Sequence, residues 1–407
     1  MMSTHFLASF IRFEHRFKIR VLFVSLTHFA FLAVFVCLLT SCTTTVKDYA
    51  GYHVDGTGVL RLPEDFDRPN PFAQTIKMPS SRWVPASWSE LPGWDSDTIG
   101  SAWAAWVYSC RVPAPEWKRA CEQVIALADA PEMIKRQWMY DTLQPYRIES
   151  HDGNVKGVLT AYYEPVFRAQ RQPVGDFKYP LYLAPADLNA NKPYWTRKQI
   201  ETNAKAKQAL QGRAFAYLAD PLDVMVLHIQ GSGQLILTEP NGSVKRVRAA
   251  FAASNNHKYG SIGRYLLDKK LITDATWPGI KQWLDANPQR VNEVMWANPR
   301  YIFFKEEPVE NPAIGPVGAQ GVPLTSGRSI AVDKSSVPYG SPVWISSQDA
   351  DPQRQTFNRL VLAQDTGSAI VGAVRADYFW GQGPEAGDQA GRTKQTLYMW
   401  TFLPRQN

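Results

Sequence analysis

Short apolar runs separated by glycine and proline, from residue 155 to the end of the chain, constrain the fold most strongly. The runs are rich in β-branched and aromatic residues and are only four to seven residues long, which favours strands over helices. They lie at 158–163, 180–183, 224–230, 234–238, 243–249, 329–332, 342–345, 360–363, 369–374 and 397–403. Asn241-Gly242 between two of the runs is the strongest hairpin signal. This spacing predicts a mainly β chain that contains a small barrel or a sandwich.

Helical patterns interrupt the strands. The predicted helices lie at 113–143 (two helices), 196–212, 261–271 and 277–296. Pro115 and Glu132 mark the starts of the first two, and Asn298-Pro299 stops the last. A chain of 407 residues that mixes these elements is long enough for two or three domains.

The N-terminal residues indicate a secretion signal rather than part of the fold. Basic residues precede the almost uncharged stretch 21–40, which is typical of a signal peptide, although its length also suits a membrane-spanning helix. The stretch ends in Leu-Thr-Ser-Cys, which resembles the lipobox of bacterial lipoproteins. That resemblance implies removal of residues 1–41 and lipidation of Cys42. Because Thr43 follows the cysteine, it also implies anchoring on the periplasmic side of the outer membrane. Residues 42–75 are then expected to form a tether.

Composition and missing motifs exclude several classes of protein. Hydrophobic residues make up 45% of the chain, which favours a folded core over disorder. The net charge is +7, but four basic residues lie in the signal, and no basic run with interleaved aromatics remains to bind nucleic acid. The chain lacks Gly-x-Ser-x-Gly, Ser-x-x-Lys, His-Glu-x-x-His and the phosphate-binding loop. Gly381-Gln382-Gly383 lacks a third glycine and, we expect, a following helix, so it predicts no dinucleotide site.

Cysteine and histidine usage predicts one disulfide and no metal site. Cys110 and Cys121 lie in the exported part, where a disulfide between them is predicted and two buried thiols are the alternative. The four histidines beyond the signal contain no short-spaced pair, so neither zinc nor another cofactor is expected.

Three aspartates near the C-terminus are the candidates for acid–base chemistry. Asp365 directly follows an apolar strand, Asp377 is predicted to end the next one beside Tyr378, and Asp388 lies in a glycine-rich stretch. A carboxyl group desolvated by aromatic side chains has a raised pKa and suits a general acid near neutral pH. Aspartate near glycine is also common in turns and helix caps, so this pattern alone leaves both interpretations open.

Several motifs in order resemble the membrane-bound lytic murein transglycosylase A family of bacterial lipoproteins. They lie at 157–165, 229–233, 259–264, 298–305 and 365–387. The resemblance implies a double-psi β-barrel domain with an inserted second, small β-barrel domain and a groove between the two. On this basis we expect the first domain at 76–155 and 306–407, and the insert at 156–305. Two departures are the Asp365–Asp377 spacing, one residue longer than expected, and Ala161 in place of glycine.

The resemblance also implies an activity and a site. Members of the family are lyases that cut the β-1,4 bond between N-acetylmuramic acid and N-acetylglucosamine in peptidoglycan and leave 1,6-anhydromuramic acid ends. Asp377 takes the position of the single general acid and base, and Asp365 that of a supporting aspartate. The implied substrate contacts are Thr160, Tyr162, Gln230, Gly231, Ser232, Gly367 and Asp388. The implied partners are peptidoglycan glycan strands, the outer membrane through the lipid anchor, and cell-wall synthesis or division proteins.

Three alternatives remain open from the sequence. A peptidoglycan-binding lipoprotein without catalysis would share the groove but would not need Asp377. A hydrolytic muramidase would use Asp365 and Asp377 as its two carboxylates and would release reducing ends. A structural lipoprotein that links the outer membrane to the cell wall would need no cleft.

Overall fold

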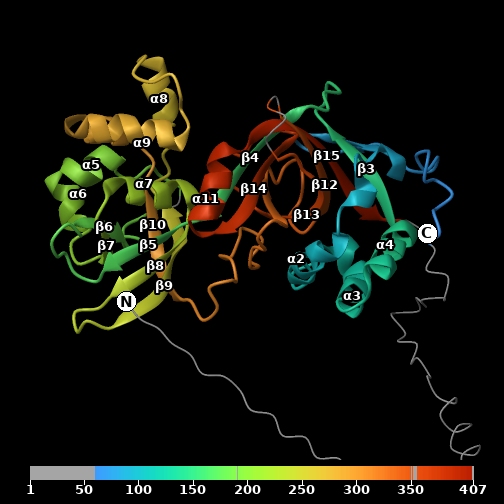
Figure 1. Cartoon of the computed structure of the whole chain (residues 1–407), viewed down its shortest axis with the longest axis horizontal. Helices are drawn as coiled ribbons and strands as arrows, with labels where there is room; N and C mark the ends of the chain where they lie inside the picture. Colours follow the sequence, from blue (N-terminus) through green and yellow to red (C-terminus); the bar gives the residue numbers. More distant parts are fainter. Residues whose placement is uncertain (1–59, 190, 350, 352–354, 406–407) are drawn as a thin grey trace, which may run out of the picture. The chain divides into compact units, whose positions relative to one another are not determined.

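The computed structural model describes residues 60–189, 191–349, 351 and 355–405 (Figure 1). All of these residues belong to one compact unit of the chain. The predicted signal peptide, Cys42 and the first part of the predicted tether lie outside the described residues.

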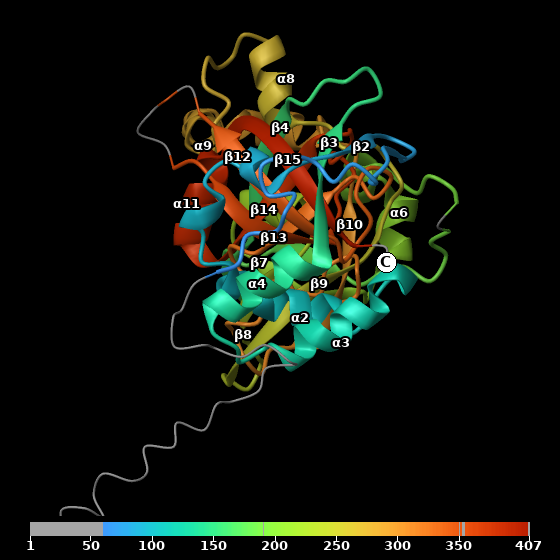
Figure 2. The same ribbon diagram turned by 90° about the vertical axis from the view of Figure 1, so that its right-hand side faces the viewer.

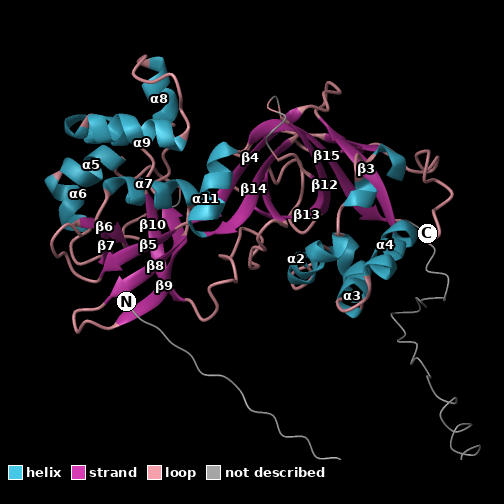
Figure 3. Ribbon diagram, in the orientation of Figure 1, coloured by secondary structure: helices cyan, strands magenta, loops and turns pink. Residues whose placement is uncertain are grey.

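A nine-stranded mixed sheet contains the first and the last strand of the described chain (Figures 1 and 3). Its order is β1-β2-β3-β15-β12-β13-β11-β14-β4. The strands are β1 (Ile76–Lys77), β2 (Arg82–Pro85), β3 (Leu143–Glu149), β4 (Gly157–Glu164), β11 (Ser329–Val332), β12 (Pro342–Gln348), β13 (Asn358–Asp365), β14 (Arg375–Gln382) and β15 (Lys394–Pro404). Because β15 also pairs with β4, the strands from β15 through β4 form a nearly closed six-strand barrel, which confirms the predicted mainly β fold.

Strand β13 explains why parts of this barrel have uninterrupted apolar sequences. Leu360 and Leu362 point into a core shared with the helices, whereas Val361 and Ala363 point into the other core of the barrel. Successive side chains of a strand lie on opposite faces. A strand buried on both faces must therefore be apolar at every position.

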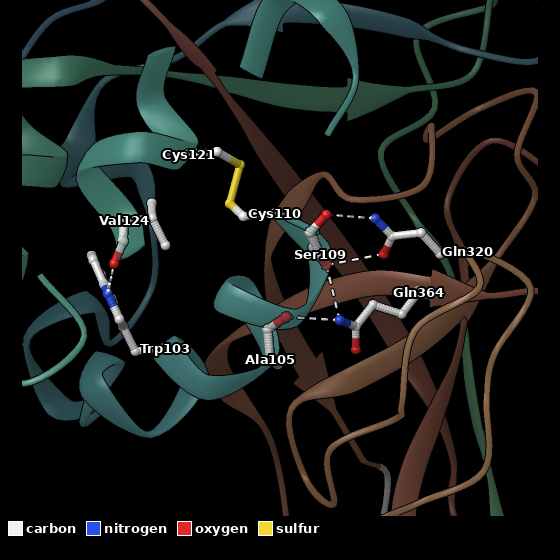
Figure 4. Close-up of a disulfide and its surroundings, with 8 residues drawn as sticks. All are labelled: Trp103, Ala105, Ser109, Cys110, Cys121, Val124, Gln320 and Gln364. Atoms are coloured by element: carbon white, nitrogen blue, oxygen red, sulfur yellow. Dashed lines mark hydrogen bonds between the residues drawn. A yellow bond between two sulfur atoms is a disulfide. The ribbon is translucent and has the colours of Figure 1, made fainter. Parts of the chain in front are cut away.

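Three helices cover the first of these cores. They are α2 (Trp103–Ser109), α3 (Lys118–Ala126) and α4 (Glu132–Thr142), which Figure 2 shows close together. Short 3-10 helices accompany them at Trp88–Glu90, Trp94–Ser96, Ile99–Ala102 and Pro115–Trp117. Eight tryptophans are buried in this cluster, so these rings stabilise the fold instead of offering platforms for sugars. A disulfide between Cys110 and Cys121 joins the end of α2 to α3 (Figure 4).

The six-stranded sheet has the order β10-β9-β8-β5-β7-β6. Its strands are β5 (Val166–Gln170), β6 (Tyr179–Tyr182), β7 (Ala214–Leu218), β8 (Gly233–Thr238), β9 (Val244–Ser254) and β10 (Ile302–Pro308). A bridge between Leu183 and Phe304 connects the β6 and β10 ends of the sheet, which curls it toward a barrel. The accompanying helices are α5 (Arg197–Thr202), α6 (Ala204–Ala209), α7 (Pro221–Gln230), α8 (Ile262–Asp268), α9 (Trp277–Ala286), a 3-10 turn (Pro288–Arg290) and α10 (Val291–Trp296).

The strand predicted at 224–230 is wrong, because these residues belong to helix α7. Asp220 caps the helix by accepting a hydrogen bond from the Leu222 amide at 2.8 Å, and Pro221 occupies its first turn. Val224 faces the core of the six-stranded sheet, whereas Met225 faces a second core among the helices. A helix buried between two cores has no polar face, so its sequence lacks the helical period and resembles a buried strand.

Other expectations about the C-terminal part also need correction. Residues 369–374 form turns around Gly372, and the strand is β14, so Asp377 is its third residue rather than its end. Gly381-Gln382-Gly383 is followed by a helix, α11 (Gly383–Arg392), which sequence reasoning missed because three glycines at 383, 387 and 391 lower its helix propensity.

The structure places two segments in other parts of the fold than the expected domain boundaries did. Residues 60–75, expected to belong to the tether, pack on the barrel: Asp65 forms an ion pair with Arg405 at 2.9 Å, and Phe66 lies edge-on to Tyr140. Strand β4, expected in the insert, pairs with β14 and β15 instead. This pairing requires glycine at position 157, because a Cβ atom there would lie only 1.6 Å from the Val374 carbonyl oxygen.

Within the described ranges, no helix has the length and apolarity needed to cross a bilayer.

Candidate active site

Four residues on adjacent strands form one row across the barrel. Ala331 of β11 is the register partner of Asp365 in β13 on one side and of Asp377 in β14 on the other. Thr160 of β4 is in turn the partner of Asp377. A single strand with a small side chain therefore separates the two aspartates. Because neighbouring strands lie about 4.8 Å apart, the two aspartate backbones are about 10 Å apart.

Asp377 is held by a hydrogen bond from the neighbouring strand β4. Arg375 donates from Nη2 to the Thr160 hydroxyl at 2.8 Å, and this hydroxyl donates to Oδ1 of Asp377. Among the described residues, no hydrogen bond reaches Oδ2 of Asp377. The carboxyl group is thus fixed through one oxygen, and its other oxygen is available to a ligand.

Asp365 accepts hydrogen bonds at both carboxyl oxygens. The Tyr162 hydroxyl donates to Oδ2 at 2.9 Å, and the Ala319 amide donates to Oδ1 at 3.0 Å. A carboxyl group whose two oxygens both accept is favoured in its ionised form. Asp365 is therefore suited to carry a negative charge, while Asp377 has an oxygen free to carry a proton.

Burial shifts the pKa values of the site. The pKa of Asp377 is raised because burial disfavours its charged form; the Thr160 hydrogen bond and the Arg375 charge oppose this. The pKa of Asp365 is also raised, first by burial and last by the charge of Asp377, against the hydrogen bonds that it accepts. Repulsion between two nearby carboxylates favours a single proton on the pair. Both residues remain partly exposed, so a ligand can reach them.

Tyr162 connects strand β4 to this pair. It lies two residues beyond Thr160, hence on the same face of the strand, and its ring packs on Phe379 with 5.2 Å between centroids. Burial, together with the nearby negative charges, raises the pKa of Tyr162 well above its usual value. The hydroxyl therefore stays protonated and acts as a hydrogen-bond donor.

The strand that ends at Asp365 is anchored on helix α2 (Figure 4). Gln364 donates from Nε2 to the Ala105 carbonyl and to the Ser109 hydroxyl, both at 2.8 Å. Ser109 in turn donates to Gln320 at 3.0 Å, next to the Ala319 amide that binds Asp365. The disulfide at Cys110 directly follows this anchor, so it restrains the helix end that supports the site.

The other predicted contact residues are not part of this row. Gln230 uses its Oε1 to accept the Tyr163 amide at 3.0 Å, and Gly231 ends helix α7 with a φ of 84°, followed by Ser232. Gly367 lies in the loop after Asp365. Asp388 is exposed on α11, and within the described part of the chain no hydrogen bond links it to either aspartate.

Sequence reasoning missed Arg375 and the Ala319 amide. Arg375 lies two residues before Asp377, and this spacing places both side chains on one face of a strand. That signal could have identified it if β14 had been assigned correctly. A backbone amide leaves no signal in the residue types. No group of three or more His, Cys, Asp or Glu residues suited to a metal ion occurs among the described residues.

The barrel carries paired aspartates that form a candidate acid–base site, and comparisons with known proteins identify the family of the chain. Two family models match, the MltA specific insert domain over residues 158–305 and the 3D domain over residues 328–403. The membrane-bound lytic murein transglycosylase A of Vibrio cholerae is 32% identical over 61% of this chain and 65% of its own length, just under two thirds.

Two solved structures are also similar. The lytic transglycosylase LtgG of Burkholderia pseudomallei shares 39% identity at a TM-score of 0.56 and is matched over 83% of this chain and 99% of that one. MltA from Neisseria gonorrhoeae shares 30% identity at a TM-score of 0.68, over 85% and 98%. The chain belongs to the membrane-bound lytic murein transglycosylase A family.

Proposed function

We propose that the protein is a peptidoglycan lytic transglycosylase that cleaves the β-1,4 bond between N-acetylmuramic acid and N-acetylglucosamine. The observation that carries this proposal is the difference between the two aspartates. Asp377 keeps one carboxyl oxygen free, whereas both oxygens of Asp365 accept hydrogen bonds. One group can therefore exchange a proton with the substrate while the other keeps its charge.

In the proposed reaction, Asp377 serves as acid and then as base. Its proton passes to the glycosidic oxygen as the bond from this oxygen to C1 of the muramic acid breaks, which leaves positive charge on the ring. The C6 hydroxyl oxygen of the same sugar attacks C1, and its proton passes to Asp377. The products are an N-acetylglucosamine end with a free hydroxyl and a 1,6-anhydromuramic acid end. No water is consumed, and Asp377 is again protonated.

Asp365 is assigned the role of a charge that stabilises the positively charged transition state. It carries no proton in either step, which distinguishes this proposal from a hydrolytic muramidase with two reacting carboxylates. The further contacts that we propose for the glycan strand are Gln230, Gly231, Ser232, Gly367 and Asp388.

The test is digestion of purified peptidoglycan by the fragment that begins after Cys42, followed by mass spectrometry of the products. Anhydromuramic ends are expected. Reducing ends, which are heavier by one water, would instead support the hydrolytic alternative, and binding without cleavage would support the non-catalytic one.

Tyr162→Phe is expected to lower activity about tenfold, the effect of losing one hydrogen bond to a charged group. The lost bond lowers the pKa of Asp365 in the wild type, so its removal raises that pKa further. Asp365 then becomes protonated at a higher pH, and the acidic limb of the pH–rate profile moves to higher pH. Tyr163→Phe is the matched control, because the Tyr163 side chain binds neither aspartate. A profile identical to wild type would contradict the role of Tyr162.

We also propose that Cys42 carries the lipid anchor at the periplasmic face of the outer membrane, on the basis of the sequence that precedes it. Cys42→Ala is expected to move the protein out of the membrane fraction, since acyl chains contribute about 0.8 kcal/mol per buried methylene group. Fractionation of cells with and without the substitution checks this. Equal membrane retention of both proteins would contradict it.

A further inference from the structure

A cavity of about 590 Å³ opens between loops of the two sheets, outside the row of Asp365 and Asp377. Its lining includes Lys192, His257, Lys258, Arg300, Ser368 and Ala369, and no acidic residue contributes to it. Three fixed positive charges around one cavity favour an anionic ligand. The volume exceeds what a single small ion needs, since a water molecule occupies about 30 Å³ of liquid.

Arg300 is the residue of this cavity whose position is fixed by hydrogen bonds. Its amide donates to the Asn298 side chain at 3.2 Å, and Arg197 donates to its carbonyl at 3.0 Å; both partners are buried. Its Nη1 donates to the His257 carbonyl at 3.2 Å. The backbone and one side of the guanidinium are therefore held in place before any ligand arrives, which lowers the entropy cost of binding.

Arg300 has no carboxylate partner, in contrast to the buried Arg248 and Arg328. Arg248 pairs with Glu164, and Arg328 pairs with Asp97 at 2.7 Å. Among the residues that the structure describes, no Asp or Glu lies within 4.0 Å of Arg300. Burial lowers its pKa without compensation from a neighbouring charge. A half-buried cation without a carboxylate partner is costly to the fold, and an anionic ligand would offset that cost.

The cavity adjoins the catalytic residues through the loop after β13. Ser368 lies three residues beyond Asp365, and three residues of chain span at most about 10 Å. A group in the cavity can therefore belong to the same molecule as a sugar bound at Asp365.

We propose that this cavity binds a carboxylate of the peptide carried by the muramic acid residues of the substrate. This inference rests on the proposed function, because it takes peptidoglycan as the substrate. A glycan strand itself is neutral except where a muramic acid has lost its peptide and exposes a lactyl carboxylate. The cavity volume and its three separate cations favour the longer, more highly charged peptide.

The experiment measures binding of three ligands to protein inactivated by Asp377→Asn: peptide-bearing strand fragments, peptide-free fragments with free lactyl carboxylates, and neutral chitohexaose. Adding Arg300→Gln is expected to weaken binding of the peptide-bearing fragments about tenfold, to reduce their salt dependence, and to change the other two less than twofold. Lys192→Gln with Lys258→Gln tests the same site with exposed residues, so a folding defect of the Arg300 variant leaves the proposal testable. Lys118→Gln, exposed on α3, is the matched control.

Each outcome has a distinct meaning. An equal loss of affinity for peptide-bearing and peptide-free fragments would overturn the proposal in favour of the lactyl carboxylate. An equal loss of affinity for all three ligands would overturn it by showing that these residues only support the structure. Unchanged affinity in both variants would overturn it by showing that they do not contact the ligand. Failure of the proposed function would look different, because wild-type protein would then release no anhydromuramic ends from either kind of strand.

Discussion

Asp377→Asn is expected to reduce cleavage by about 10²- to 10⁴-fold, the usual contribution of a general acid or base. Asparagine nearly matches aspartate in size, and its side-chain oxygen can still accept the Thr160 hydroxyl that binds Oδ1. The fold and glycan binding should therefore persist. The amide cannot deliver a proton to the glycosidic oxygen or accept one from the C6 hydroxyl, so both half-reactions are impaired.

Release of anhydromuramic ends, measured by mass spectrometry at fixed enzyme concentration, checks this result. Asp176→Asn is the matched control, because that carboxylate is exposed in the turn between β5 and β6, outside the proposed site. Asp365→Asn should reduce activity less, since Asp365 is assigned a stabilising charge rather than a proton transfer. If Asp365→Asn is inactive while Asp377→Asn keeps more than about a tenth of the activity, the two roles are reversed.

Glu164→Ala is expected to lower the free energy of unfolding by about 3–5 kcal/mol, the usual cost of leaving one charge of a buried ion pair without its partner. Glu164 ends strand β4 and is fully buried. Arg248 of β9 binds its carboxylate, and Gln234 of β8 donates to it at 2.8 Å. The substitution therefore leaves the Arg248 charge buried and also creates a cavity.

Urea-induced unfolding of the fragment beginning after Cys42 measures this effect. Asp268→Ala is the matched control: it removes the Arg264–Asp268 ion pair, whose side chains are 75% and 58% exposed, and such surface pairs contribute about 1 kcal/mol or less. Equal midpoints for Glu164→Ala and the wild type would show that the buried pair does not hold β4 to the six-stranded sheet.

The sequence predicted the elements of the barrel better than the geometry of its site. Short apolar runs bounded by turn residues predicted strands at β11, β12 and β13, and a further apolar run at 397–403 predicted most of β15. The motif order pointed to Asp377 and Asp365. Yet Tyr162 binds Asp365 across a separation of 203 residues, and only the strand register brings them together. Residue types do not encode register between distant strands.

Errors arose where the local sequence resembled another kind of element. Helix α7 is mostly apolar because it packs against two cores, so it resembled a strand. Helix α11 contains three glycines and resembled a loop. Arg375 was missed because the start of β14 was assigned to the wrong residues, which hid its two-residue spacing from Asp377.

Strand β15 must be in place before the barrel is closed. Residues 394–404 pair with β12, β3 and β4, and the β15–β4 pairing closes the barrel. Thr160, which holds Asp377, pairs with Lys394 in that last strand. The acid–base row therefore lacks one neighbour until the C-terminal strand is in place. Because the closing contacts join residues hundreds of positions apart, they form slowly relative to local helices. A chain that is still emerging, or has lost its last strand, thus lacks the closed barrel around the candidate site, and the proposed wall-degrading activity would depend on completion of the fold.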